Sequence, residues 1–260
     1  TVQGTITLTG SGSSSYGAGG IVGQLSGTEG SVRNCRSDVT ITGGQNVGGI
    51  VGYVSSGYST ATKSITGCVN TGRITSNSNN AGGIVGYISG QVTVDSCYNR
   101  GTIAGGGWRA GGITAYLSSS NAVIKNCYTT GVVTGKDSAA VVGKKSSGSI
   151  SDCYYLDTLG TDSNATAKTS EELKTLASTL GEPFMTAPAG VNNGYPIFAW
   201  QVPTYAVTFR TGATGASITV NGISGQADAD GKYTVKLPDG TYEYTVSAFG
   251  YQAAAGQVTV

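Results

Sequence analysis

Short apolar runs, each ended by Gly, Asn or Ser, recur along the first 155 residues of the chain. A block with the pattern Gly-Gly-Ile-Val-Gly, or a close variant of it, occupies residues 19–23, 48–52, 82–86, 111–115 and 139–143. Successive copies start 29, 34, 29 and 28 residues apart. A nearly constant period of this size predicts a stacked repeat array.

Each copy also contains one cysteine, and the residue three positions before that cysteine is always Val or Ile. The cysteines are Cys35, Cys68, Cys97, Cys127 and Cys153. Each repeat therefore contains three strand-like segments separated by turn residues. A unit this short cannot bury its apolar side alone. We predict an all-β fold in which residues 1–157 form a three-sided parallel β-helix of about five coils, with strands about 4.8 Å apart.

Alternation along the first strand of each coil predicts which columns point inward. The Ile50 column is expected inside. The next column contains Thr114 among valines and is expected outside. The Gly52 column is expected inside, at a place where only a small residue fits. The column after it is expected outside and contains Tyr53, Tyr87 and Tyr116.

The residue before each cysteine is a turn former, and this predicts a corner that returns the cysteine to the interior. These residues are Asn34, Gly67, Ser96, Asn126 and Asp152. The residues after the cysteines are expected to face outward; they are Arg36, Val69, Tyr98, Tyr128 and Tyr154. Stacked cysteines point the same way and not at each other, so we expect free, buried thiols.

The repeats stop after Tyr155, and a different pattern follows. Thr169 and Glu172 form a capping-box signature, and apolar residues with helical spacing follow it before Gly181. We assign residues 158–202 as a cap with one helix, in which the aromatic stretch 195–200 covers the last coil. Residues 203–260 contain five β-runs and are predicted to form a small antiparallel β-sandwich, with Asp239-Gly240 as a hairpin turn.

The repeats, as in GGIVGYISG and VDSCYNRGTIAGG, closely resemble the GLUG motif of bacterial secreted and surface proteins. The stretch from ITVNG to TYEYTVSAFGY is similar to PEGA or carboxypeptidase-regulatory-like β-sandwich repeats. The resemblance implies an exported protein of the bacterial cell surface, such as an adhesin. It supplies no catalytic motif, because the GLUG pattern consists of core and turn positions.

Charged residues are few, at 11% of the chain, and the formal net charge is +1. A nucleic-acid partner would require a basic face, and no apolar stretch reaches the length of a membrane span. We therefore expect neither nucleic-acid binding nor membrane insertion of this segment. Nothing in the sequence calls for an oligomer, and a monomer is favoured.

Catalysis within these residues would need acids or bases that converge, and the repeats do not supply them. The chain has no His, and the acids of the array fall at different positions of the repeat. Asp95 and Lys125 share one outward column and are expected to form a surface ion pair. Asp228 and Asp230 faintly resemble a calcium loop, but a turn explains them equally well. We expect no catalytic residues, no metal site and no cofactor.

Exposed aromatic residues are the best binding candidates. Tyr53, Tyr87 and Tyr116 are predicted to stack on one outer face, and Trp108 lies beside Arg109 in the glycine-rich loop 105–109. The insertion at residues 55–62 is a second candidate loop. Flat amphipathic rings suit contact with a sugar or a peptide. The alternative is a ladder that only stabilises the stack of strands.

Together these features favour a non-enzymatic, extracellular surface module, adhesin or adhesin-like, that presents a rigid solenoid to a host protein or glycan. The alternative is a non-catalytic accessory region of a larger secreted carbohydrate-active enzyme or peptidase.

Overall fold

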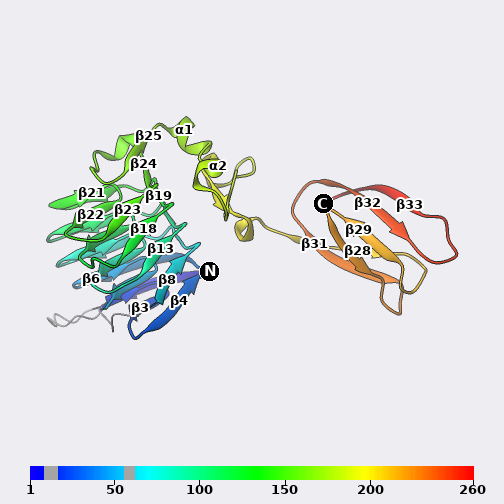
Figure 1. Ribbon diagram of the computed structural model, residues 1–260, viewed down its shortest axis with the longest axis horizontal. Coiled ribbons are helices and arrows are strands. Elements are labelled where there is room, and N and C mark those ends of the chain that lie inside the picture. The colour runs from blue at the N-terminus through cyan, green and yellow to red at the C-terminus, as the bar shows by residue number, and fades with distance from the viewer. Residues whose placement is uncertain (9–16, 56–61) are drawn as a thin grey trace. The chain divides into compact units, whose positions relative to one another are not determined.

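The computed structural model describes residues 1–8, 17–55 and 62–260, and these form two compact units, Thr1–Ala199 and Trp200–Val260 (Figure 1). The first unit is a parallel β-solenoid of about five coils, and the second consists of small antiparallel sheets. The predicted fold class is confirmed. Among the described residues, no helix is both long and apolar enough to cross a membrane.

Strands from successive coils lie side by side and form parallel sheets, which we call A to D (Figure 1). Sheet A contains, in spatial order, β20 (Val133–Thr134), β15 (Ile103–Gly105), β10 (Ile74–Ser76), β5 (Arg36–Gly43), β9 (Val69–Asn70), β14 (Tyr98–Asn99), β19 (Tyr128–Thr129), β24 (Tyr154–Leu156) and β25 (Thr166–Lys168), with β1 (Val2–Thr7) also beside β5. Sheet B contains β2 (Gly17–Gly19), β6 (Asn46–Gly48), β11 (Asn80–Gly82), β16 (Arg109–Gly111) and β21 (Asp137–Ala139).

Sheet C contains β22 (Val142–Lys145), β17 (Thr114–Leu117), β12 (Val85–Ile88), β7 (Val51–Val54) and β3 (Val22–Leu25). Sheet D contains β23 (Ser149–Ser151), β18 (Val123–Lys125), β13 (Thr93–Asp95), β8 (Thr62–Thr66) and β4 (Glu29–Arg33). The first and third segments of each predicted repeat are therefore each divided by an additional corner. Equivalent residues pair between coils, as Ile74 does with Ile41 and Ile103.

Glycine pairs allow neighbouring coils to approach within backbone contact at the corner between sheets B and C. A Cβ placed on Gly83 would lie 1.9 Å from the carbonyl oxygen of Gly112 and 2.5 Å from the side chain of Asn99. One on Gly86 would lie 2.5 Å from the carbonyl oxygen of Gly52. The prediction that only a small residue fits the column of Gly86, which also contains Ala115, agrees with these distances, because a larger side chain would collide with the facing backbone.

An interior ladder of polar side chains lies against this corner. The Nδ2 of Asn70 donates to Oδ1 of Asn99 at 2.8 Å, and the Nδ2 of Asn99 donates to Oγ1 of Thr129 at 3.2 Å. Both amides also bond the backbone two residues ahead, at Gly72 and Gly101. Burial of these amides is tolerated because their donors and acceptors have partners.

The column of Val51, Val85 and Thr114 is inside the solenoid, and the prediction that it faces outward was wrong. These residues are fully buried, and the valines belong to the same core cluster as the Ile50 column. Ile50 lies in the corner before β7, and the register between β7 and β12 omits Gly52, so strict alternation does not apply and Ile50, Val51 and Val54 all enter the core. The hydroxyl of Thr114, which suggested exposure, is buried and has no hydrogen-bond partner.

The predicted corner before each cysteine is confirmed by the backbone. Asn34, Gly67, Ser96, Asn126 and Asp152 all have positive φ values, between 49° and 63°. This left-handed conformation favours Gly and Asn. The turn places each following cysteine at an equivalent position, where its Sγ donates to the carbonyl oxygen two residues before it. The five cysteines form one file and are free thiols.

The C-terminal end of the solenoid is closed by residues 157–168, a segment that includes a short 3-10 helix, η1 (Asp157–Leu159). Strand β25 pairs with β24 and ends sheet A, while Leu159 and Ala165 pack on the core. Oδ2 of the buried Asp162 accepts hydrogen bonds from the backbone N–H groups of Val141 and Val142, at 2.8 and 2.9 Å. The carboxylate thus replaces the backbone carbonyl groups of a further coil as the acceptor for these two N–H groups.

The rest of the cap covers the outer surface of sheet A along several coils, including Tyr154 of the last one, and does not cover the end of the solenoid. This corrects the predicted role of the aromatic stretch. The elements are α1 (Ser170–Lys174), α2 (Ala177–Leu180), β26 (Phe184–Met185), η2 (Asn192–Gly194), β27 (Ile197–Phe198) and η3 (Ala199–Gln201). Strand β26 pairs with β27. The predicted Thr169 capping box is present at the start of α1.

Tyr98 and Tyr128 lie on the outer surface of sheet A, as predicted, but they are buried beneath this cap. Their rings stack at 4.8 Å and contact Phe184, and Tyr98 also contacts Phe198. The hydroxyl of Tyr128 donates to the carbonyl oxygen of Pro196. These tyrosines are therefore core residues between solenoid and cap.

The second unit contains two antiparallel sheets. One pairs β28 (Tyr205–Arg210) with β31 (Lys232–Leu237), and the other has the order β30 (Ile223–Gln226), β29 (Ser217–Val220), β32 (Thr241–Ser247), β33 (Ala254–Thr259). Asp239-Gly240 connects strands of different sheets, so the predicted hairpin there was wrong. A hairpin with a two-residue turn lies instead at Asn221-Gly222, between β29 and β30, where both residues have positive φ.

The closure at Asp162 generates a stability prediction. Asp162→Ala leaves two buried N–H groups without an acceptor and is expected to lower the free energy of unfolding by about 2–4 kcal/mol. Asp157→Ala, which removes an exposed carboxylate from the same segment, should change it by less than about 0.5 kcal/mol. Chemical denaturation of both variants measures the difference, and equal stabilities would contradict the role given to Asp162.

The cysteine file generates a reactivity prediction. Burial raises the pKa of the Cys97 and Cys127 thiols, and the Cys127 thiol together with burial raises the pKa of Cys153. Because the thiolate is the reactive form, native protein at pH 8 should react only at the half-buried Cys35. Denatured, unreduced protein should show five thiols in a colorimetric titration. A lower number in the denatured protein would mean that disulfides had formed.

Candidate ligand-binding grooves

The three predicted tyrosines form a stacked column on the outer surface of sheet C. The ring centroids of Tyr53 and Tyr87 are 5.3 Å apart, and those of Tyr87 and Tyr116 are 4.9 Å apart with an interplanar angle of 5°. Each hydroxyl shares a hydrogen bond with a serine one coil further on, at 2.8 to 3.2 Å. Both faces of the Tyr87 ring are therefore occupied by other tyrosines, and only its edge is available to a ligand.

A groove of about 220 Å³ runs beside this column, and we call it the tyrosine groove. Its lining residues are Gln45, Asn46, Tyr53, Asn79, Asn80, Tyr87, Arg109 and Tyr116. The amides of Asn46 and Asn80 are on sheet B, and the tyrosines are on sheet C, so the glycine corner between the sheets brings the two columns together. The Nδ2 of Asn80 donates to Oδ1 of Asn46 at 2.7 Å, which continues the stacking of equivalent side chains.

Arg109 contributes the one charge among the residues that line this groove. Its guanidinium lies over the ring of Tyr116, with Cζ 4.2 Å from the ring centroid, and its Nη1 donates to Oδ1 of Asn80 at 3.5 Å. The predicted residues Tyr53, Tyr87, Tyr116 and Arg109 therefore share one groove. The amide residues beside them were not identified from the sequence, although the column of Asn46 and Asn80 recurs with the repeat period.

Trp108, the remaining predicted residue, does not line the tyrosine groove. Its side chain is 48% exposed, and the Nζ of Lys136 lies 4.8 Å from its ring centroid. Trp108 is therefore a separate candidate contact next to the groove. The other predicted binding loop, residues 55–62, lies outside the described residues except at its two ends.

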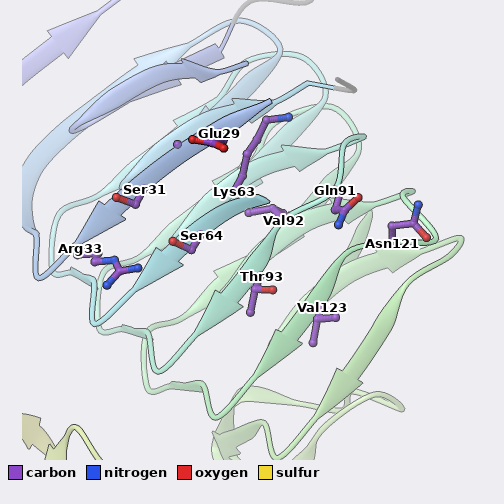
Figure 2. Close-up of a pocket in the computed structure, with 11 residues that line it drawn as sticks. Glu29, Ser31, Arg33, Lys63, Ser64, Gln91, Val92, Thr93, Asn121 and Val123 are labelled. Atoms are coloured by element: carbon purple, nitrogen blue, oxygen red, sulfur yellow. The ribbon is translucent and has the colours of Figure 1, made fainter. Parts of the chain in front are cut away.

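A second and larger groove, of about 610 Å³, lies on the outer surface of sheet D (Figure 2). It crosses strands of successive coils, and the small side chains of Ser31, Ser64 and Thr93 form a column within it (Figure 2). The remaining side chains that line it are Glu29, Arg33, Lys63, Gln91, Val92, Asn121 and Val123. Sequence reasoning did not find this groove, because it is produced by small residues and not by a distinctive motif.

The charges of the sheet D groove are of both signs and do not converge on a reaction centre. Lys63 is buried, with its Nζ donating to the carbonyl oxygen of Ser55 at 3.0 Å, and burial lowers the pKa of its ammonium. Glu29 is the one carboxylate that lines this groove. Glycoside hydrolysis by the usual mechanism needs a pair of carboxylates, and this groove does not provide one.

Two acids of the repeat array already have partners. The Lys125 ammonium lies 3.3 Å from Oδ2 of Asp95, as predicted, and Asp38 pairs with Arg36 at 3.0 Å. In the second unit, Oδ1 of Asp228 accepts the N–H groups of Asp230 and Lys232, as a turn requires. Within the described residues, no group of three or more potential ligating side chains is placed to hold a metal ion.

Comparison with known proteins agrees with the repeat architecture. Residues 14–42 match the family model of the GLUG motif. No match is found among curated proteins. The solved structures include one titled as that of a "putative immunoglobulin A1 protease" from Bacteroides ovatus, with a TM-score of 0.55 and 25% sequence identity. The similarity covers 66% of this chain and spans 58% of the other chain's length.

The stacked tyrosines generate a prediction about their contribution to folding. Tyr87→Ala removes a ring with neighbours on both faces and is expected to lower the free energy of unfolding by about 2–4 kcal/mol. Tyr87→Phe keeps the stack, loses one hydrogen bond, and should cost about 1 kcal/mol. Trp108→Ala, an exposed aromatic on the same array, serves as the control. If Tyr87→Ala is no less stable than that control, the column does not stabilise the solenoid.

Proposed function

We propose that this chain is a non-enzymatic, extracellular module of a bacterial protein that binds a glycan in the tyrosine groove, as an adhesin or adhesin-like protein does. The observation that carries the proposal is the convergence of amides, tyrosine edges and one arginine from three coils along a single groove. A side-chain amide both donates and accepts hydrogen bonds, and so does a sugar hydroxyl. The lining residues include no acid that could act in catalysis.

The extracellular and bacterial parts of the proposal are supported by the GLUG match and by the similarity to the Bacteroides protein. The rigidity of the solenoid supports a binding role in a further way. Each groove residue is on a strand or next to one, and strands in register hold their side chains without a folding cost at the moment of binding. A preorganised groove of this kind suits recognition of a ligand with repeated hydroxyl groups.

A second candidate function is an accessory region of a larger secreted peptidase or carbohydrate-active enzyme, with catalysis outside these residues. The similarity to the structure titled as a putative immunoglobulin A1 protease favours this candidate. Both functions use the same groove. The two candidate functions differ in what the complete protein does. Under both of them, incubation of residues 1–260 with immunoglobulin A1 should produce no cleavage.

A glycan array with two matched double variants tests the groove. Gln45→Ala with Asn79→Ala removes two amides from the tyrosine groove, and Gln91→Ala with Asn121→Ala removes the same two groups from the sheet D groove. We expect the first pair to weaken glycan binding at least tenfold, since each lost hydrogen bond contributes about 1 kcal/mol. The second pair should leave binding within twofold of the wild type.

The reverse result would place the binding site in the sheet D groove. If Trp108→Ala loses glycan binding and both double variants keep it, the binding site lies at the neighbouring loop 105–109. Absence of binding to every glycan on the array, by a folded wild-type chain, would contradict the proposed function.

A further inference from the structure

We propose that the glycan bound in the tyrosine groove carries a carboxylate, and that the guanidinium of Arg109 binds it. This inference rests on the proposed function and specifies the class of sugar. Its basis is a cation that lines the groove without a counter-ion. In the described part of the chain, Arg109 forms no ion pair with any carboxylate.

The hydrogen-bond donors of Arg109 are largely unused. A guanidinium has five N–H donors. One of them reaches Oδ1 of Asn80 at the long distance of 3.5 Å, and the buried Nε has no hydrogen-bond partner. Its contact with the ring of Tyr116 holds the guanidinium in the groove without using its N–H groups. A planar fork held in this way is suited to a two-point contact with a carboxylate.

The surroundings of Arg109 are also electropositive. Asp137 is paired with Arg109 in the strand register of the next coil, yet none of the ion pairs in the described part of the chain joins these two residues. Against this acid stand Lys136, over the ring of Trp108, and the exposed Lys144, in register with Tyr116. An acidic sugar entering the groove therefore meets an excess of positive charge.

Neutral groups of the groove suit the remainder of the same ligand. The amides of Asn46 and Asn80 and the side chains of Gln45 and Asn79 would bond ring hydroxyls, and these groups do not distinguish an acidic sugar from a neutral one. The preference for a carboxylate would accordingly depend on Arg109. Uronic acids and sialic acids both supply this group, and the experiment separates them.

Binding of residues 1–260 is measured against two matched pairs of immobilised glycans: galacturonic-acid oligomers with their methyl esters, and sialylated lactose with lactose. We expect one acidic member to bind at least tenfold more tightly than its neutral partner, as a charge-assisted hydrogen bond allows. That preference should decrease as salt rises from 50 to 500 mM. The pair that shows it identifies the source of the carboxylate.

Arg109→Gln should abolish the preference, and Arg109→Lys should retain part of it because the charge remains while the planar fork is lost. Arg33→Gln removes the same charge from the sheet D groove and should change nothing. Thermal unfolding confirms that each variant is folded. Equal binding of acidic and neutral members, or a preference that survives Arg109→Gln, would overturn this inference and leave the proposed function intact. Absence of binding to all glycans would instead overturn both.

Discussion

Direct backbone contact between neighbouring coils is the constraint on which this solenoid depends. At the corner between sheets B and C, a Cβ on Gly83 would lie 1.9 Å from the carbonyl oxygen of Gly112 in the next coil, and one on Gly49 would lie 2.1 Å from that of Gly83. Because the chain is this tightly folded there, the two sheets pack against each other and equivalent residues remain in register. The amide ladder of Asn70 and Asn99 fills the space beside this corner, and its backbone hydrogen bonds go to Gly72 and Gly101, between strands of sheet A.

Because the coils stack in register, residues at equivalent positions of successive repeats lie side by side. Features that follow from the repeat period alone could therefore be predicted from the sequence. The corner before each cysteine, the cysteine file, the tyrosine column and the ion pair of Asp95 with Lys125 all belong to this class. The capping box at Thr169 was predictable for a different reason, since it is a local rule within four residues. In each case the information lies in residue type and spacing, with no need to know which segments far apart in the chain come together.

The features that were missed depend on tertiary contacts or on irregular backbone. Alternation could not show that Val51 points inward, because the strand departs from regular geometry at Gly52. The burial of Tyr98 depends on a cap segment more than 80 residues later in the chain. The hairpin at Asn221-Gly222 is the exception, because an Asn-Gly pair between two β-runs is itself a sequence signal for a hairpin turn. The tyrosine groove was not predictable, because its amides come from sheet B and its tyrosines come from sheet C.

The repeat that begins at Gly48 is five residues longer than the one that follows, yet its strands keep their register on both sides. Strand β7 pairs with β12 and strand β8 with β13 without a shift, so the additional length falls between β7 and β8. A change in length at that point is thus uncoupled from the columns that build the core and the groove. The connection between β7 and β8 is therefore a position where evolution, or a protein engineer who grafts a foreign peptide, can add residues without a change in the paired strands on either side.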